Sequence, residues 1–185
     1  MSTVNVTKFQ EIGSPVLDFT ADNVSGGKLT LSAALQGKKA AVVVFWSGVC
    51  SHCVRYDDYL NGFSPRHPDL ALIAIASRQQ ETPAEIRNVI AERKLAFPIL
   101  RDPGGQLAKQ WFTQQTPRAF LIDPGLALRY RGAIDNFKFP DDPEYIGYLE
   151  PAIEDLLADR PVKQTETASF GCAIESVYYI LPKIL

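Results

Sequence analysis

Two unbroken hydrophobic runs dominate the chain, one within residues 39–46 and one at residues 70–76. Both consist largely of Ala, Val, Ile and Leu, which is typical of central strands buried on both faces of a sheet. Shorter runs predict three further strands, at residues 97–100, 116–123 and 127–132. An Asp-Pro-Gly turn separates the last two, so we expect them to form an antiparallel hairpin.

Hydrophobic residues at helical spacing lie between these strands. Five helices are expected, at residues 30–35, 53–63, 82–93, 106–111 and 144–157. Thr82, Pro83 and Glu85 form the clearest helix start, as a cap, a first-turn Pro and the third position of a capping box. The alternation of strands and helices predicts an α/β fold, in which a mixed central sheet carries helices on both faces.

The composition agrees with one ordinary globular domain and argues against nucleic-acid binding and membrane-spanning functions. Of the 185 residues, 46% are hydrophobic and 22% are charged, which excludes a disordered or fibrous chain. The net charge is -2 and Lys and Arg do not cluster, so we expect no nucleic-acid partner. No apolar stretch approaches the ~20 residues of a membrane span. Residues 1–10 lack a signal-peptide pattern, so a cytoplasmic protein is expected, or a periplasmic one if the chain is a processed form.

The end of the chain differs from the rest. We expect residues 1–159 to form the domain and residues 160–185 to form a tail, whose first part is polar and linker-like and whose last part is apolar. A tail this apolar is expected to pack on the domain or on a partner chain. An oligomer held together by the tail is therefore one hypothesis.

The three cysteines carry the most informative chemistry. Cys50 and Cys53 form a C-x-x-C pair, whereas Cys172 stands alone. Three cysteines are too few for a disulfide framework. A zinc site would need all three cysteines and His67, without the paired spacing that is typical of structural zinc. A redox pair is favoured, and neither a metal nor an organic cofactor is expected.

The pair lies where a predicted buried strand gives way to a predicted helix. Cys50 would then lie at a helix N-terminus, where free N–H groups and the helix dipole lower the pKa of a thiol and favour the reactive thiolate. Cys53, one turn along, can attack a mixed disulfide formed at Cys50. Ser51 and His52 stand between the two, and a positive charge on His52 would stabilise the reduced form and tune the potential. Two inert thiols are the alternative.

The C-x-x-C pair occurs together with two other sequence motifs, and the three motifs are specific in combination. They are Val-Val-Phe-Trp-x3-Cys-x2-Cys at residues 43–53, Thr-Pro-Arg-Ala-Phe-Leu-Ile-Asp at 116–123 and Tyr-Arg-Gly-Ala-Ile-Asp at 130–135. The combination resembles the thioredoxin superfamily, and more narrowly the redoxin (AhpC/TSA-like) thiol-disulfide oxidoreductases. The resemblance implies a thioredoxin fold and exchange of a Cys50–Cys53 dithiol with disulfide- or thiol-containing proteins or small thiols.

The same resemblance implies roles for residues around the pair. Pro117 would be a cis-proline opposite the dithiol, which holds a substrate strand beside Cys50 and shields the pair from metal. Thr116 and Arg118 would line the same groove, and Trp46 would flank the dithiol. A Pro at the start of a strand is compatible with this role.

The proton acceptor for Cys53 is left open by two departures from the family pattern. Val44 stands where many thioredoxins have Asp, and Tyr56 stands where many membrane-tethered relatives have Glu. Asp57 is a candidate for the acceptor. The alternative is that the Asp57 carboxylate is solvated on an exposed helix face.

Two other functions stay open. Peroxiredoxins resemble this fold and use Pro-x-x-x-Thr-x-x-Cys, but Val43 and Ser47 stand at the Pro and Thr positions before Cys50. Arg118 would have to act as the peroxidatic Arg. A non-catalytic binding module is the third hypothesis, against which the intact cysteine pair argues.

Cys172 has two interpretations. The segment Gly-Cys-Ala-Ile at residues 171–174 resembles the Gly-Cys-x-Ile ending of one bacterial branch of these redoxins, which favours a third redox cysteine near the C-x-x-C pair or bonded to another chain. Glu175, where that branch often has Lys, argues against it. The alternative is a buried spare thiol. A disulfide requires that the Cα atom of Cys172 lie within about 7 Å of the Cα atom of Cys50 or Cys53.

Overall fold

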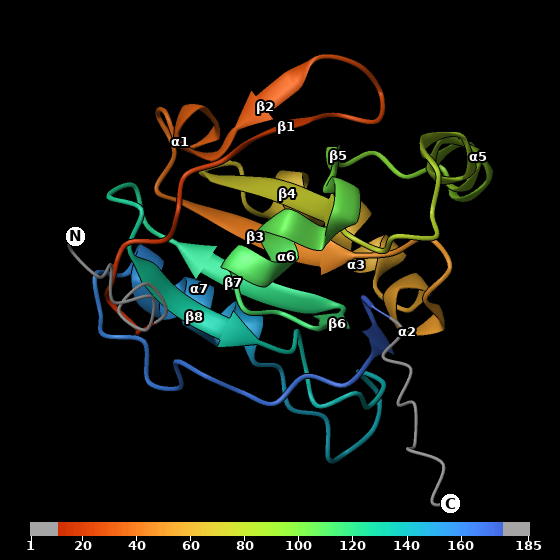
Figure 1. Ribbon diagram of the computed structural model, residues 1–185. Helices are drawn as coiled ribbons and strands as arrows, with labels where there is room; N and C mark the ends of the chain where they lie inside the picture. Colours follow the sequence, from red (N-terminus) through yellow and green to blue (C-terminus); the bar gives the residue numbers. More distant parts are fainter. Residues whose placement is uncertain (1–10, 176–185) are drawn as a thin grey trace, which may run out of the picture.

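The computed structural model describes residues 11–175, which fold around a five-stranded sheet with the strand order β5-β4-β3-β7-β8 (Figure 1). The strands are β3 (Ala40–Trp46), β4 (Leu70–Ala76), β5 (Ile99–Arg101), β7 (Arg118–Ile122) and β8 (Leu128–Gly132). β3, β4 and β5 are parallel, whereas β7 is antiparallel to both β3 and β8. The predicted mixed sheet, its parallel crossover and its hairpin are confirmed.

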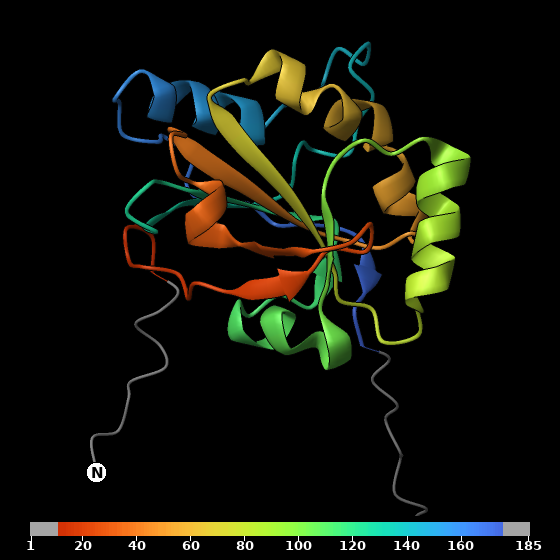
Figure 2. The same ribbon diagram turned by 90° about the horizontal axis from the view of Figure 1, so that it is seen from above.

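Helices cover both faces of this sheet, as predicted. They are α1 (Leu31–Ala34), α2 (Ser51–Val54), α3 (Asp57–Asn61), α4 (Phe63–Arg66), α5 (Pro83–Arg93), α6 (Gln106–Gln110), α7 (Leu149–Leu157) and the 3-10 turn η2 (Pro103–Gly105). Figure 2 shows α7 and the α2–α4 segment on one side of the sheet and α6 on the other. The predicted capping box starts α5, where the Thr82 side chain accepts the Glu85 N–H.

The centre of the core is β3, all of whose residues are fully buried. Val42, Val44 and Trp46 face one hydrophobic cluster, which also contains Cys50 and Cys53. The alternate residues of β3 face the second cluster, across the sheet. A strand buried on both faces needs apolar side chains at every position, which explains the unbroken hydrophobic run.

Two small strand pairs flank the main sheet. β1 (Thr20–Asp22) pairs antiparallel with β2 (Lys28–Thr30), in a segment where only loops were predicted. β6 (Gln115–Thr116) pairs antiparallel with β9 (Cys172–Ala173), which belongs to the C-terminal tail. The predicted strand at residues 116–123 is thus divided at Pro117 into β6 and β7.

Two helix predictions are wrong in their extent. The helix predicted at residues 53–63 is divided into the short helices α2, α3 and α4. The helix predicted at 144–157 begins only at Leu149, because the side chain of Asn136 binds the preceding segment. Its Oδ1 accepts the Ile146 N–H at 3.1 Å and its Nδ2 donates to the Glu144 carbonyl at 2.7 Å. Ile146, expected on the buried helix face, is 52% exposed.

The described part of the tail, residues 160–175, packs on the domain. Thr165 and Thr167 form backbone hydrogen bonds with Arg131 of β8, and Glu166 forms an ion pair with the same Arg131 at 2.7 Å. Further along, Ile174 is buried in the second core cluster. The domain boundary at residue 159 stays a prediction. The apolar stretch at 177–185, on which the oligomer hypothesis depends, lies outside the described residues. None of the helices within residues 11–175 is long and apolar enough to cross a membrane.

Candidate active site

The C-x-x-C pair lies just beyond the end of β3. Ser47, Gly48 and Val49 lead from the strand to Cys50, which is the N-cap residue of α2. The Cys50 N–H donates to the Ser47 carbonyl at 3.3 Å, and the Cys50 carbonyl accepts the Cys53 N–H at 2.9 Å. Cys53 therefore lies one helical turn behind Cys50, as predicted, and both side chains are fully buried.

Cys50 is bonded to the cysteine of the tail. A disulfide joins Cys50 to Cys172 with a Cα–Cα distance of 5.9 Å, and Cys53 is a free thiol. The separation lies within the ~7 Å that a disulfide requires. Cys172 is thus neither distant from the pair nor without a partner.

The segment before Pro117 lies directly beside this disulfide. The Thr116–Pro117 peptide bond is cis, as the family resemblance implied. The carbonyl oxygen of Thr116 lies 3.3 Å from Cys50 Sγ. On its other side Thr116 pairs with Cys172 across β6 and β9, so the backbone of the tail occupies the groove next to the cis-proline.

The thiol of Cys53 is held in its protonated form. The pKa of Cys53 is raised to about 12, chiefly by burial and in smaller part by the negative charge of Glu81. Hydrogen bonds from the Ser47 backbone and the Thr116 side chain, together with the charge of Arg93, lower this pKa but do not offset the burial. Cys53 therefore needs a base before it can attack a disulfide.

Glu81 supplies a carboxylate that the sequence analysis missed. It lies between β4 and α5 and is only 3% exposed. Its Oε1 accepts the Gly48 N–H at 2.7 Å, whereas its Oε2 has no hydrogen-bond partner among the described residues. One signal existed in the sequence, because the C-terminal ends of neighbouring parallel strands meet at one edge of a sheet. A Glu soon after the second strand was therefore a candidate neighbour of the dithiol.

Asp57, the candidate from the sequence, is bound to Arg93. The Nε of Arg93 donates to Asp57 Oδ2 at 2.6 Å, and the Asp57 side chain is 14% exposed. The alternative of a solvated carboxylate on a helix face is wrong. Arg93 Nη1 also donates to the Gly48 carbonyl at 2.9 Å, so Arg93 and Glu81 hold both peptide groups of Gly48.

The surroundings of Gly48 leave little room for a side chain. A Cβ atom there would lie 3.0 Å from Glu81 Oε1 and 3.3 Å from the ring of Trp46. Trp46 itself is fully buried at the end of β3, and the guanidinium of Arg93 lies 5.5 Å from its ring centroid. The loop before Cys50 is thus fixed from three sides.

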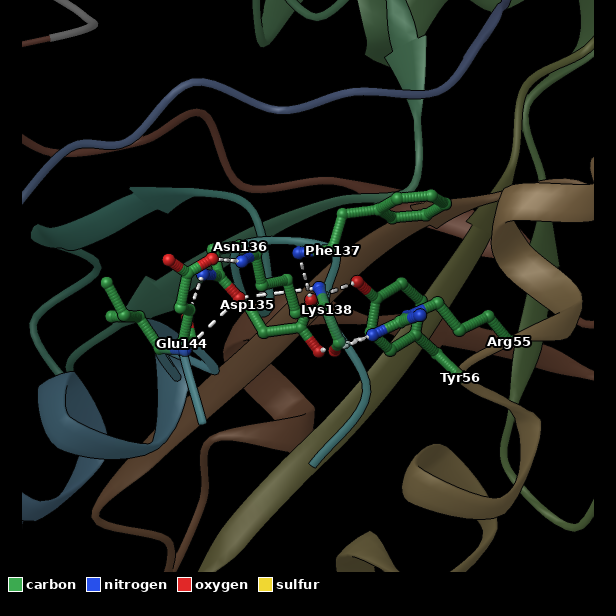
Figure 3. A network of polar contacts seen from close by, with 8 residues as sticks. Arg55, Tyr56, Asp135, Asn136, Phe137, Lys138 and Glu144 are labelled. Atoms are coloured by element: carbon green, nitrogen blue, oxygen red, sulfur yellow. Dashed lines mark hydrogen bonds and ion pairs between the residues drawn. The ribbon is translucent and has the colours of Figure 1, made fainter. Parts of the chain in front are cut away.

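A polar network holds another loop over α2, and Figure 3 shows it from close by. Asp135 is its centre, since its Oδ1 accepts the Tyr56 hydroxyl at 2.6 Å and the Phe137 N–H at 2.7 Å. Arg55 forms an ion pair with the same Asp135 at 3.7 Å. The ring of Phe137 in turn packs on His52, with ring centroids 4.9 Å apart.

The remaining predicted site residues lie in α2 and at the start of β7. Ser51 is exposed in the first turn of α2, and His52 lies next to it with its Nδ1 buried and unpartnered among the described residues. Arg118 starts β7, and its guanidinium lies over the ring of Phe120. Burial lowers the pKa of Arg118 and the charge of Arg131 lowers it further. The tuning role of His52 and the groove role of Arg118 stay predictions.

The residues of the alternative zinc site do not form a ligand set. Cys50 and Cys172 are bonded to each other, and His67 Nε2 lies 2.9 Å from the carboxylate of Glu150. Among residues 11–175 no group of three or more His, Cys, Asp or Glu side chains is arranged to hold a metal ion.

Comparison with known proteins identifies the family. The model of the AhpC/TSA family matches residues 12–131. The chain belongs to the AhpC/TSA family. The match ends before the tail, so Cys172 lies outside the part of the chain that defines this AhpC/TSA protein.

The chain is also similar to a curated thiol-disulfide oxidoreductase. The thiol-disulfide oxidoreductase ResA of Bacillus thuringiensis subsp. konkukian (strain 97-27) is 29% identical over 113 residues, which cover 61% of this AhpC/TSA chain and 64% of ResA. The alignment therefore spans less than two thirds of the length of that relative.

Solved structures confirm the thioredoxin fold. A hypothetical protein of Sinorhizobium meliloti 1021 superimposes with a TM-score of 0.78 at 27% identity, covering 89% of this chain and 93% of that protein. Peroxidoxin BcpB of Mycobacterium tuberculosis superimposes with a TM-score of 0.63 at 16% identity, covering 82% and 99%. A peroxidoxin shares the fold, so the fold alone does not separate peroxidase from disulfide exchange.

Proposed function

We propose that this AhpC/TSA protein is a thiol-disulfide oxidoreductase that exchanges its Cys50–Cys53 dithiol with disulfides of partner proteins. The observation that carries the proposal is the bonding pattern of the three cysteines. Cys50 is bonded to a cysteine outside the C-x-x-C pair, while Cys53 stays a thiol one turn behind it. This is the covalent arrangement of a mixed-disulfide intermediate.

In the first step, the Cys50 thiolate attacks one sulfur of a partner disulfide. The partner's S–S bond breaks, its second sulfur leaves and takes up a proton, and a mixed disulfide joins Cys50 to the partner. The partner backbone runs beside Thr116, whose carbonyl lies 3.3 Å from Cys50 Sγ.

In the second step, Cys53 attacks Cys50 Sγ and releases the partner cysteine as a thiol. Two electrons have then passed from the dithiol to the partner disulfide, and a Cys50–Cys53 disulfide remains. Because the pKa of Cys53 is about 12, the thiol must lose its proton as it attacks. Glu81 accepts this proton, since its Oε2 is buried and unpartnered among the described residues and its charge acts on Cys53.

An insulin-reduction assay with a peroxide-consumption assay beside it tests this function. We expect the wild-type protein to reduce insulin disulfides, and Cys50→Ser to abolish the activity because the attacking sulfur is lost. Cys53→Ser should instead accumulate mixed disulfides, visible as a mass increase that a reductant removes. Insulin reduction that survives Cys50→Ser would contradict the proposal, and rapid peroxide consumption without insulin reduction would favour the peroxidase alternative.

We also propose that residues 171–174 correspond to the Gly-Cys-x-Ile ending of the redoxin branch named above. Two observations support this. The segment is ordered against β6, and its cysteine is bonded to the C-x-x-C pair. If the two endings correspond, the bond between the tail cysteine and Cys50 gives this ending a chemical role.

A further inference from the structure

The tail meets the active site in the way that a partner strand would. In the β6–β9 pair, Thr116 is opposite Cys172 and Gln115 is opposite Ala173. The Ile174 N–H continues the pairing by donating to the Gln114 carbonyl at 2.9 Å. Residues 172–174 thus form an extended strand along the segment that leads into the cis-proline, and main-chain pairing of this kind binds peptides at a sheet edge.

Two anchors hold the tail on either side of residues 168–173. The first anchor is at residues 165–167, where the Thr167 hydroxyl lies 2.7 Å from the Tyr130 hydroxyl and accepts the Ala133 N–H at 2.9 Å. The second is at Ile174 and Glu175, which are held by burial and by an ion pair with Lys109 at 3.0 Å. The span between them includes Phe170, which is 68% exposed. If the second anchor is released, the first one keeps Cys172 near Cys50 at a high effective concentration.

The docked tail closes the site to other molecules. Cys50 and Cys53 are both 0% exposed with the tail in place. An external disulfide can therefore reach Cys50 only after residues 171–174 have left the groove.

The groove has no space for a side chain at Gly171, the residue before Cys172. A Cβ atom on Gly171 would overlap the carbonyl group of Thr116. A strand can therefore come this close to Thr116 only with glycine in that position, or by shifting away from it.

We infer that the tail is a tethered substrate and that Cys172 is a third redox cysteine, which exchanges with Cys50 and competes with partner proteins for the same groove. This inference rests on the proposed function. It also names the substrate class: an extended protein segment that pairs with residues 114–116 and has glycine before its cysteine.

The exchange needs no outside oxidant. Once a partner has oxidised the dithiol to Cys50–Cys53, the Cys172 thiolate attacks Cys50 Sγ and the Cys50–Cys53 bond breaks. The Cys50–Cys172 bond forms, Cys53 leaves and takes up a proton, and the number of disulfides is unchanged. In the reverse direction Cys53 gives its proton to Glu81, attacks Cys50 Sγ and frees Cys172, which opens the groove.

Disulfide mapping of the full chain tests the exchange directly. The reduced protein is oxidised with one equivalent of oxidised glutathione, its thiols are blocked in acid, and the cross-linked peptides are quantified by mass spectrometry. We expect Cys50–Cys172 as a major species in the wild type and an at least tenfold drop in Gly171→Val, with a matching gain of Cys50–Cys53. The control Ala168→Val, on an exposed tail residue outside β9, should match the wild type. An unchanged yield in Gly171→Val, or a wild type with Cys50–Cys53 alone, would overturn the inference.

Kinetics of insulin reduction separate this inference from the proposed function. We expect Cys172→Ser to raise the rate several-fold, because its tail can no longer close the site covalently. An unchanged or lower rate in Cys172→Ser would overturn the tail's competing role while leaving the exchange activity in place. Activity in Cys50→Ser would instead refute the proposed function itself.

A peptide probe tests the substrate class. A synthetic peptide with the sequence of residues 169–175, activated at its cysteine as a mixed disulfide, is added to the double variant Cys53→Ser, Cys172→Ser. We expect it to form a disulfide with Cys50 at least tenfold faster than its Gly171→Val version. Equal rates for the two peptides would show that the groove does not select glycine before the cysteine.

Discussion

Cys53 and Glu81 are both buried at the site, and the negative charge of Glu81 acts on the Cys53 thiol. A thiol with a pKa of about 12 is ionised to only about one part in 10⁵ at pH 7, so an unassisted attack by Cys53 would be slow. The buried Glu81 carboxylate, whose Oε2 has no hydrogen-bond partner within residues 11–175, is a suitable acceptor for its proton. In the proposed mechanism, the rate of the second step therefore depends on a proton transfer between two side chains that are far apart in the sequence.

Replacement of the carboxylate tests this proton transfer. We expect Glu81→Gln to slow the attack of Cys53 on a mixed disulfide at Cys50 by about 10²-fold at pH 7. The deficit should shrink as the pH rises toward 12, because more Cys53 is then already thiolate. The measurement is the release of thionitrobenzoate from its mixed disulfide with Cys50, in a Cys172→Ser background.

Whether Glu81→Gln slows or speeds the release distinguishes a proton acceptor from a nearby charge that only shifts the pKa of Cys53. The negative charge of Glu81 raises the pKa of Cys53, so its removal lowers that pKa and increases the thiolate fraction. A faster release in Glu81→Gln would therefore contradict the role of proton acceptor. Glu92→Gln, on an exposed residue of α5, is the matched control and should leave the rate unchanged.

At the element scale, one side chain of α5 joins three parts of the site. Arg93 binds Asp57 of α3, the carbonyl of Gly48 in the loop before Cys50, and the face of Trp46 at the end of β3. The Arg93 and Asp57 side chains are only 16% and 14% exposed. An ion pair this sheltered costs more to break than a surface pair, because the remaining charge is left poorly solvated.

Loss of this connection should appear in stability. We expect Arg93→Met to lower the free energy of unfolding by about 3 kcal/mol, since the Asp57 carboxylate loses its partner. Arg87→Met, on an exposed position of the same helix, should change the free energy by less than about 0.5 kcal/mol. Urea unfolding of the reduced proteins is the measurement, and equal losses in the two variants would contradict the role of Arg93.

At the scale of the whole molecule, the Cys50–Cys172 disulfide joins the tail to the centre of the fold. It links residues 122 positions apart in the sequence. A cross-link over a loop of this length is expected to stabilise the folded chain by about 5 kcal/mol through the lost entropy of the unfolded state. A Cys50–Cys53 disulfide closes only one helical turn, so its contribution is expected to be much smaller.

Thermal unfolding measures this difference. We expect the oxidised wild type to unfold roughly 10 °C above its reduced form. In Cys172→Ser the oxidised form carries only the Cys50–Cys53 bond, so the gap between its oxidised and reduced forms should be a few degrees at most. An equal gap in both proteins would show that the long-range disulfide does not form in solution.

Local patterns in the sequence predicted the central sheet and the position of the C-x-x-C pair. The unbroken apolar run of β3, the capping box at Thr82 and the C-x-x-C spacing each depend on neighbours within a few residues, so each can be read without coordinates. The cis-proline at 117 came from the family resemblance.

Only the tertiary structure decided what surrounds the thiols. Glu81 reaches the loop before Cys50 because β3 and β4 are adjacent and parallel. Arg93 reaches Asp57 because α5 packs on the same face of the sheet. Cys172 reaches Cys50 because a tail that follows the last helix returns to pair with β6. These contacts join residues that are distant along the chain, and hydrophobic periodicity reports only which face a residue turns to the core and not which distant residue it meets there.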